Sequence, residues 1–299
     1  VVRMVLVALF AGGHCLLEGL PGLGKTRLVT TVARCLDLDF GRIQFTPDLM
    51  PADITGTDVL VQGDGSALVK FRKGPVFTDV LLADEINRGT PRTQSALLEV
   101  MQERTVTVLG STHELEAPFF VLATQNPIDL EGTYPLPEAQ LDRFLFKINI
   151  APEGVQEFVS ILRRFSGADE PSPELVCTSQ QVLVYQKRIR EVLVPDNVEH
   201  YIAHIVRSAA PGLEDSPDSV RKYVRFGPSP RALLALAAGA KVLAFSDGRA
   251  NVSIEDVDEV AVYALNHRLI LSFEGESEGI SSADIVGDIL KSARKKARA

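Results

Sequence analysis

Residues 19–26, with the sequence GLPGLGKT, limit the folds that this chain can adopt more than any other feature. They fit the P-loop pattern GxxxxGK[ST], in which glycines let the backbone curl so that successive N–H groups face phosphate oxygens. The apolar run 15–17 precedes the loop as an expected strand, and a helix is expected from Lys25, whose dipole would add positive charge at the loop. Because a chance glycine-rich loop would not require this strand–loop–helix context, the sequence predicts a nucleotide phosphate site.

Each position of the pattern has an expected role. Lys25 would contact the β- and γ-phosphates, and the Thr26 hydroxyl would bind Mg²⁺. We expect the loop and the first turn of the helix to hold the nucleotide, through Gly19, Pro21, Gly22, Leu23, Gly24, Lys25, Thr26 and Arg27.

The first half of the chain, residues 1–150, alternates short apolar runs with helical patterns. Continuous apolar strands separated by helices are typical of a parallel sheet covered on both faces. A helix is expected over 1–11, ended by Gly12 and Gly13; a signal peptide is the alternative interpretation of this apolar start. The expected strands are 15–17, 44–46, 80–83, 119–123 and 146–150.

Two further stretches interrupt this α/β pattern as expected β-hairpins. The first joins 59–61 to 68–71 through a Gly/Asp turn, and the second joins 105–108 to 114–116 across Gly110. The predicted fold class is therefore an α/β P-loop NTPase core with a parallel sheet and two inserted hairpins.

Helical periodicity dominates the second half of the chain, where no strand is expected. Residues 151–180 are predicted to be a linker and the start of a lid, with a polar stretch at 166–173, and 181–299 an all-α lid domain. Ser253 with Asp256 resembles a capping box. The expected helices are 180–193, 197–208, 230–245 and 253–271.

Two acids follow the apolar strand 80–83. Asp84 would belong to the Mg²⁺ shell, and Glu85 would polarise a water molecule for attack on the γ-phosphate. The alternative is an acidic pair at a helix N-terminus. Asn126 follows the strand 119–123; it could orient the attacking water or sense the γ-phosphate, or it could simply form a turn.

Two arginines could stabilise charge on a transferring phosphoryl group. Arg143 follows a helix expected to begin near Pro137; its alternative role is a surface salt bridge with Asp142 or Glu138. Arg231 begins a helix, where a cation is unfavourable without a partner. That partner could be a nucleotide phosphate or a nearby acid.

The composition limits the class of protein. With 31 Lys and Arg against 39 Asp and Glu, the net charge of −8 is unusual for a dedicated duplex-DNA or membrane-surface binder. The longest apolar run, 4–11, is far shorter than the roughly 18 residues of a membrane span. Three scattered cysteines give no disulfide framework and no zinc spacing. These features favour a cytoplasmic protein without a membrane span.

The combined motifs resemble the MoxR family of AAA+ ATPases, within the clade that carries an insert in helix 2. The resemblance covers nearly the whole chain apart from 151–180. The stretches that carry it are 17–26, 45–54, 83–88, 94–99, 123–127, 131–144, 227–231 and 266–268.

The resemblance implies roles that spacing alone leaves open. ATP and Mg²⁺ would be the cofactors, Asn126 would be sensor 1, Arg143 an arginine finger acting on a neighbour's ATP, and Arg231 sensor 2 in the lid. The hairpins would be the helix-2 insert and the pre-sensor-1 hairpin, facing a central pore. The chain would form a ring, expected to be a hexamer, and act as a chaperone-like remodeller of protein clients with a von Willebrand A domain partner.

Two other functions are compatible with these motifs. A nucleic-acid motor like the helicases of the same clade is favoured by Lys70, Arg72 and Lys73, but the segment 105–117 contains no Lys or Arg. Loops that track a phosphate backbone should be basic, so nucleic acid is not the expected partner. A non-enzymatic, nucleotide-dependent ring is disfavoured because it would not require Glu85.

Overall fold

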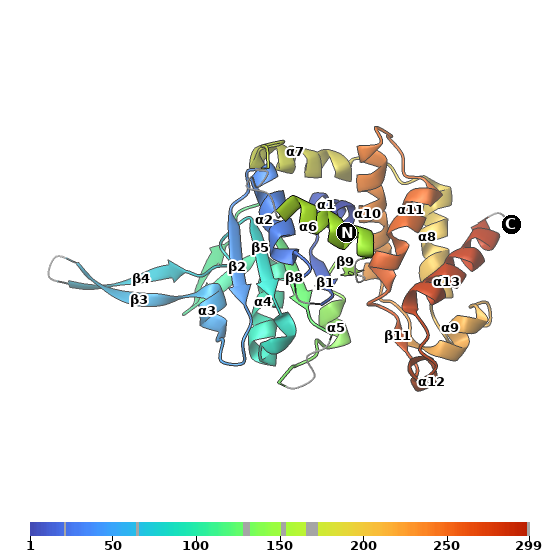
Figure 1. Cartoon of the computed structure of the whole chain (residues 1–299), viewed down its shortest axis with the longest axis horizontal. Helices are drawn as coiled ribbons and strands as arrows, with labels where there is room; N and C mark the ends of the chain where they lie inside the picture. Colours follow the sequence, from blue (N-terminus) through green and yellow to red (C-terminus); the bar gives the residue numbers. More distant parts are fainter. Residues whose placement is uncertain (21, 64–65, 128–131, 151–153, 166–172, 298–299) are drawn as a thin grey trace. The chain divides into compact units, whose positions relative to one another are not determined.

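The structure is a computed structural model that describes residues 1–20, 22–63, 66–127, 132–150, 154–165 and 173–297 (Figure 1). The chain divides into two compact units. Unit 1 comprises Val1–Cys15, Leu136–Ile148 and Val184–Ala299, and unit 2 comprises Leu16–Pro135 and Asn149–Leu183. Segment 136–148, which carries Arg143, is thus grouped with the C-terminal helices. The domain boundaries near 150 and 180 stay predictions.

The central sheet has five strands in the order β2-β5-β8-β1-β9. The β2–β5 and β5–β8 pairs are parallel, as expected for this fold class. Leu82 and Leu122 are fully buried, which fits strands covered on both faces. The strands are β1 (Cys15–Glu18), β2 (Phe40–Gln44), β5 (Val80–Asp84), β8 (Phe120–Gln125) and β9 (Phe146–Asn149).

The position predicted for the second strand was wrong. The predicted strand 44–46 begins where β2 ends, at Gln44. Strand β2 is an edge strand of the sheet, and Ile43 is its one buried residue, so its sequence FGRIQ lacks the continuous apolar run of an inner strand. The correction matters because it places the Gln44 side chain at the carboxyl end of the sheet.

The helices of unit 2 begin where local sequence signals favour them. Helix α4 follows Thr90, whose hydroxyl accepts the N–H of Thr93, and has Pro91 in its first turn. Helix α6 lies in the stretch 151–180, predicted to be a linker and the start of the lid, where no helix was predicted; residues 166–172 of that stretch lie outside the described part of the chain. These helices are α2 (Lys25–Cys35), α3 (Pro51–Thr55), η1 (Ile86–Arg88), α4 (Pro91–Glu103) and α6 (Val155–Phe165).

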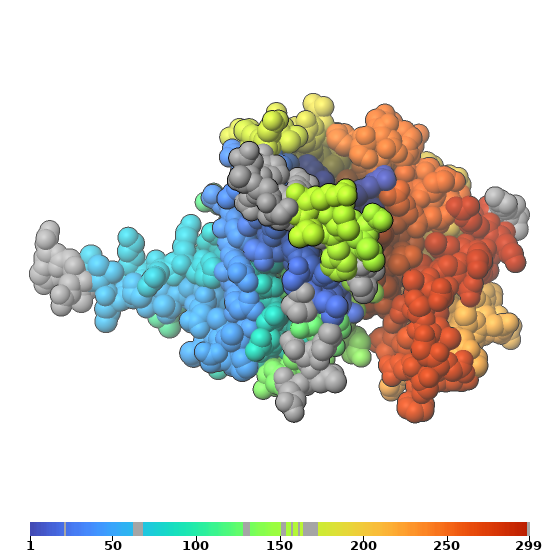
Figure 2. Space-filling view, viewed as in Figure 1, coloured from blue at the N-terminus to red at the C-terminus, as the bar shows by residue number. Residues whose placement is uncertain are grey.

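Both inserted hairpins are confirmed within unit 2. Strands β3 (Gly56–Gly63) and β4 (Ser66–Lys73) form a long ribbon that extends away from the sheet (Figures 1 and 2). Strands β6 (Thr105–Val108) and β7 (Ser111–Glu114) form the shorter one. Its second strand begins earlier than predicted because Leu109 and Gly110, at φ 45° and 84°, complete the turn alone.

Unit 1 is mainly helical. Helices α8, α10, α11 and α13 pack together, and α1 packs on α10. The predicted capping box holds, since Ser253 Oγ accepts the Asp256 N–H and the Asp256 carboxylate accepts the Ser253 N–H. The helices with residues in this unit are α1 (Val2–Phe10), α5 (Glu138–Leu141), α7 (Ser179–Arg190), α8 (Asp196–Ser208), α9 (Asp218–Tyr223), α10 (Arg231–Ser246), α11 (Ile254–Leu265), α12 (Phe273–Ser277) and α13 (Ser282–Ala297).

The helix predicted over 253–271 ends at Leu265, so its C-terminal part was wrong. Beyond it, Asn266, His267 and Arg268 direct their side chains to backbone carbonyls of 144–147. Residues Ile270–Leu271 form strand β11, which pairs with β10 (Val224–Phe226), a small ribbon that the sequence did not predict. In the described part of the chain, no helix has the length and apolar character needed to cross a bilayer.

Candidate active site

The P-loop of unit 2 connects β1 to α2. Gly22 and Gly24 adopt φ of 85° and 71°, a region in which side chains are strained, and Gly24 is the N-cap of α2. The Lys25 ammonium donates to the Gly19 carbonyl, which ties the helix start back to the beginning of the loop. Pro21 lies outside the described residues.

Lys25 lies in the field of acids at the carboxyl ends of β5 and β1. Burial lowers the pKa of Lys25 from its ordinary value, while the charges of Asp84, Glu85 and Glu18 oppose that shift. Burial removes part of the hydration of the ammonium, while the carboxylates favour its charged form, which is the form that attracts a phosphate group.

Asp84, at the end of β5, is held by two neighbouring strands. Its Oδ1 accepts the Thr124 hydroxyl of β8 at 2.7 Å, and its Oδ2 lies 2.7 Å from Arg42 Nη2 of β2. Thr124 is buried, and its oxygen also accepts the backbone N–H of Glu85 at 2.8 Å. One hydroxyl thus fixes both acids, with each hydrogen bond contributing about 1 kcal/mol.

Glu85 has a strained backbone and a constrained side chain. Its φ of 54° and ψ of 50° are left-handed, which costs a non-glycine residue roughly 1–2 kcal/mol. Its Oε2 accepts hydrogen bonds from Gln44 Nε2 at 2.8 Å and Arg88 Nη1 at 3.0 Å. Strain that the surroundings maintain in this way is found most often at functional sites.

Asn126 follows β8 and is 8% exposed. Its backbone carbonyl accepts Asn87 Nδ2 at 3.1 Å, so the segments after β5 and after β8 are joined beside the two acids. Because neighbouring parallel strands end at the same edge of a sheet, Asp84, Glu85 and Asn126 lie at one edge. Their catalytic roles stay predictions.

The residues of unit 2 fit a magnesium nucleotide. Gly22 and Gly24, both at positive φ, give the loop a backbone path that other residues would adopt only with strain, and Thr26 and Asp84 supply the hard oxygen ligands that Mg²⁺ prefers. Among the described residues there is no cluster of three or more metal-binding side chains. Mg²⁺ does not require one at such sites, since phosphates and water complete its shell.

Arg42, Gln44, Arg88 and Thr124 were not predicted as site residues. Each of them contacts Asp84 or Glu85. For Arg42 and Gln44 a correct boundary for β2 would have provided the signal, because the parallel register sets Gln44 opposite Asp84.

The two candidate arginines belong to unit 1. Arg231 begins α10 as predicted, and its Nη1 lies 3.4 Å from Asp142 Oδ2, so a nearby acid partners this cation. Arg143 follows α5 in the turn that begins at Asp142, and it is partly exposed. Their relation to the nucleotide stays a prediction.

Comparisons with known proteins decide the family. Residues 14–146 match the family described as "ATPase family associated with various cellular activities (AAA)", and residues 218–289 match the AAA lid domain. The chain is 42% identical over 294 residues to chaperone MoxR1 of Mycobacterium tuberculosis, covering 97% of this chain and 76% of that protein. The chain belongs to the MoxR family of AAA+ ATPases.

Other relatives agree with this MoxR-family assignment. Protein MoxR of Methylorubrum extorquens is 30% identical over 306 residues, covering 97% of this chain and 87% of that protein. A crystal structure of a protein from Cytophaga hutchinsonii superposes with a TM-score of 0.90 at 44% identity, covering 97% of this chain and 88% of that one. The predicted fold class, an AAA+ core with a helical lid, is confirmed.

Proposed function

We propose that this MoxR-family chain hydrolyses ATP and uses the energy to remodel a protein client. The observation that carries the proposal is the arrangement around Glu85. A strained carboxylate is fixed by Thr124, Gln44 and Arg88, next to the Mg²⁺-type acid Asp84 and within the field of Lys25. A non-enzymatic nucleotide switch would need no second carboxylate held in this way.

The proposed hydrolysis gives each residue a distinct step. Backbone N–H groups of the P-loop and Lys25 bind the phosphates, while Thr26 and Asp84 would hold Mg²⁺, which neutralises phosphate charge when bound. Gln44 and Arg88 both contact Oε2 of Glu85. Its Oε1 therefore accepts a proton from the attacking water, which Asn126 orients.

The two arginines complete the proposed reaction. Arg143 acts as an arginine finger on the ATP of an adjacent copy, and Arg231 senses the phosphates of its own copy. An arginine supplied in trans contributes roughly 10³–10⁵ in rate. The proposed assembly is a ring of identical chains, with a hexamer as the expected size.

The hairpins of unit 2 are the proposed client surface. Leu60 and Val69 face each other across β3 and β4 and are 76% and 65% exposed, and Leu109 at the tip of the second hairpin is 85% exposed. Phe71 of β4 stacks on His113 of β7 with ring centroids 3.9 Å apart, so the hairpins contact each other. Exposed apolar residues of this kind suit contact with a polypeptide.

A nucleic-acid motor is the second candidate, because Lys70 and Arg72 are exposed on β4. The second hairpin opposes it, with exposed Glu114 and, beyond its last strand, exposed Glu116. Cations would be needed at these positions to bind a phosphate backbone. We therefore favour a protein client, with a von Willebrand A domain protein as the expected partner.

The experiment compares stimulation of phosphate release by different partners. Unfolded casein, a von Willebrand A domain protein, single-stranded DNA, duplex DNA and RNA are added at low salt. We expect stimulation by a protein and its loss in Leu109→Ser, but not in the matched control Ser111→Ala. Several-fold stimulation by nucleic acid alone, abolished by added salt, would favour the motor instead.

A further inference from the structure

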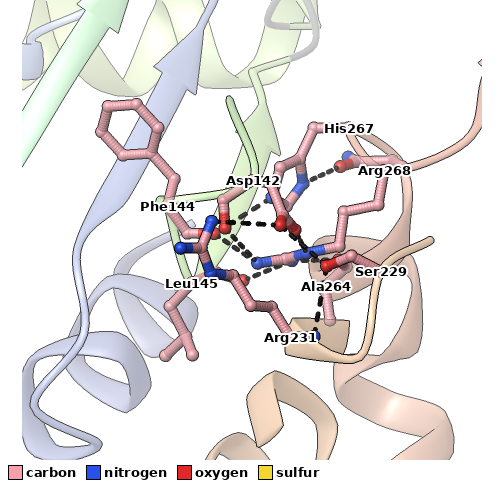
Figure 3. A network of polar contacts seen from close by, with 9 residues as sticks. Asp142, Phe144, Leu145, Ser229, Arg231, Ala264, His267 and Arg268 are labelled. Atoms are coloured by element: carbon pink, nitrogen blue, oxygen red, sulfur yellow. Dashed lines mark hydrogen bonds and ion pairs between the residues drawn. The ribbon is translucent and has the colours of Figure 1, made fainter. Parts of the chain in front are cut away.

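The Asp142 carboxylate, next to Arg143 in the chain, joins three parts of unit 1 (Figure 3). Its Oδ1 accepts Arg268 Nε at 2.7 Å. Its Oδ2 accepts the Ser229 hydroxyl at 2.8 Å and lies 3.4 Å from Arg231 Nη1. One carboxylate therefore contacts both a buried arginine and the proposed sensor of ATP.

Arg268 fixes the backbone on both sides of Arg143. Its side chain is 3% exposed and donates to the carbonyls of Asp142, Phe144 and Leu145 at 3.1, 2.8 and 3.1 Å. His267 Nε2 lies 3.1 Å from the Phe144 carbonyl as well. Residues of the lid therefore set the geometry of the turn that carries Arg143.

Arg231 is held much more weakly by the same carboxylate. Its side chain is 49% exposed and its contact with Asp142 is long, at 3.4 Å. As a cation at the start of α10, it gains from any anion, and a phosphate group could replace the carboxylate. Arg268 is thus the permanent partner of Asp142 and Arg231 the exchangeable one.

We propose that Asp142 is a positioning residue that couples Arg231 to the turn carrying Arg143. When Arg231 binds a phosphate instead of Asp142, Asp142 Oδ2 keeps its hydrogen bond to Ser229 but loses a neighbouring positive charge. The turn that contains Asp142 and Arg143 then changes its conformation in response. The nucleotide state of one copy then influences how its Arg143 is presented to the next copy. This inference rests on the proposed roles of Arg143 and Arg231.

The main test is Asp142→Asn, which retains an oxygen acceptor for Arg268 but removes the charge that holds Arg231. Binding of a slowly hydrolysed ATP analogue is measured by calorimetry. We expect about two- to fivefold tighter binding, because an exposed ion pair of this kind contributes a factor of that size. The gain should vanish in the Arg231→Ala background. Glu255→Gln, an equal charge change elsewhere in unit 1, should leave affinity unchanged.

A merely structural role for Asp142 predicts weaker binding, never a gain that depends on Arg231. Unchanged or weaker binding in Asp142→Asn, or a gain that persists without Arg231, would overturn the coupling. If Asp142→Asn does not fold, Ser229→Ala also changes the contacts of Asp142 Oδ2, and here we expect nucleotide affinity to fall instead of rise. Losing the hydroxyl should strengthen the hold on Arg231 and weaken binding about twofold, and unchanged or tighter binding would contradict the coupling.

The presentation of Arg143 is tested by mixing subunits. Lys25→Ala subunits, which supply Arg143, are mixed with Arg143→Ala subunits, with and without Arg231→Ala in the Lys25→Ala chain, a change that leaves the Asp142–Arg268 pair intact. We expect a recovered rate about two- to fivefold lower with it, the size of an exposed ion pair, and equal rates would refute the coupling. If Arg231→Ala alone leaves nucleotide affinity unchanged, the proposed sensor role of Arg231 is refuted as well. If Arg231→Ala weakens nucleotide binding but Asp142→Asn gives no gain in affinity, only the coupling is refuted.

Discussion

The two arginines that share Asp142 should differ sharply in their contributions to stability. Arg268 is buried and bonded to a carboxylate and several backbone carbonyls, and burial lowers its pKa while Asp142 opposes that shift. Removing Arg268 leaves the carbonyls of Asp142, Phe144 and Leu145 without this donor and leaves Asp142 with only its exposed cation, Arg231, so the cost should approach the roughly 3–5 kcal/mol of a broken buried pair. We therefore expect Arg268→Ala to lower the free energy of unfolding by this amount.

Arg231→Ala removes a cation from the same carboxylate but from its exposed side. A half-exposed pair contributes about 0–1 kcal/mol, so its effect on unfolding should be several-fold smaller. In the double variant Asp142→Asn/Arg268→Met both charges of the pair are gone, and we expect most of the lost stability to return.

Urea unfolding followed by circular dichroism measures these differences. The change in the free energy of unfolding is the shift in the urea midpoint multiplied by the denaturant slope of the unsubstituted protein. Equal losses in Arg268→Ala and Arg231→Ala, or a loss below about 1 kcal/mol in Arg268→Ala, would refute the buried-pair argument. Failure of the double variant to recover would instead indicate that the carbonyl contacts of Arg268 dominate.

Three further predictions concern the site and its surroundings. Glu85→Gln should bind ATP normally but lose at least about a hundredfold in turnover, whereas Lys25→Ala should lose ATP binding too. Equal losses of binding in a fluorescent-nucleotide titration would refute the role of Glu85 in activating water. Gln44→Ala should lower kcat about two- to tenfold with little change in KM, because Glu85 loses one of the side chains that hold it, and an unchanged kcat would count against that role. Burial and the neighbouring Arg268 lower the pKa of His267 well below its ordinary value, so its neutral form stabilises the fold above the unfolded pKa of about 6.5, and that stability is lost as the pH falls below it. In His267→Gln the urea midpoint should depend less on pH between pH 6.5 and 5 than in the unsubstituted protein. The same dependence on pH in both proteins would contradict this prediction.

The sequence predicted the parts of the fold that depend on local pattern. The P-loop, the inner strands and the Ser253 capping box each have a signal within a few residues. Strand β2 was misplaced because an edge strand with one buried residue lacks the apolar run of an inner strand. Helix α11 was predicted too long because its end is set by contacts of 266–268 with carbonyls more than 100 residues away in the chain.

The same distinction applies to the site. Lys25, Thr26, Asp84 and Glu85 follow from motifs that chemistry constrains within short windows. The supporting residues Gln44 and Thr124 could not be found in this way, because their partners are about 40 residues away and only the register of the sheet brings them together. Asp142 likewise gains its three partners only through tertiary folding.

Mixing two inactive variants tests the central claim most directly, since ATP hydrolysis here is proposed to need residues from two copies of the chain. Lys25→Ala retains Arg143 but lacks a competent P-loop, and Arg143→Ala retains the P-loop but lacks the finger. We predict that each is inactive alone, that the mixture recovers part of the phosphate release, and that the rate per subunit of the unsubstituted protein rises with concentration. A concentration-independent rate together with no recovery on mixing would contradict the account.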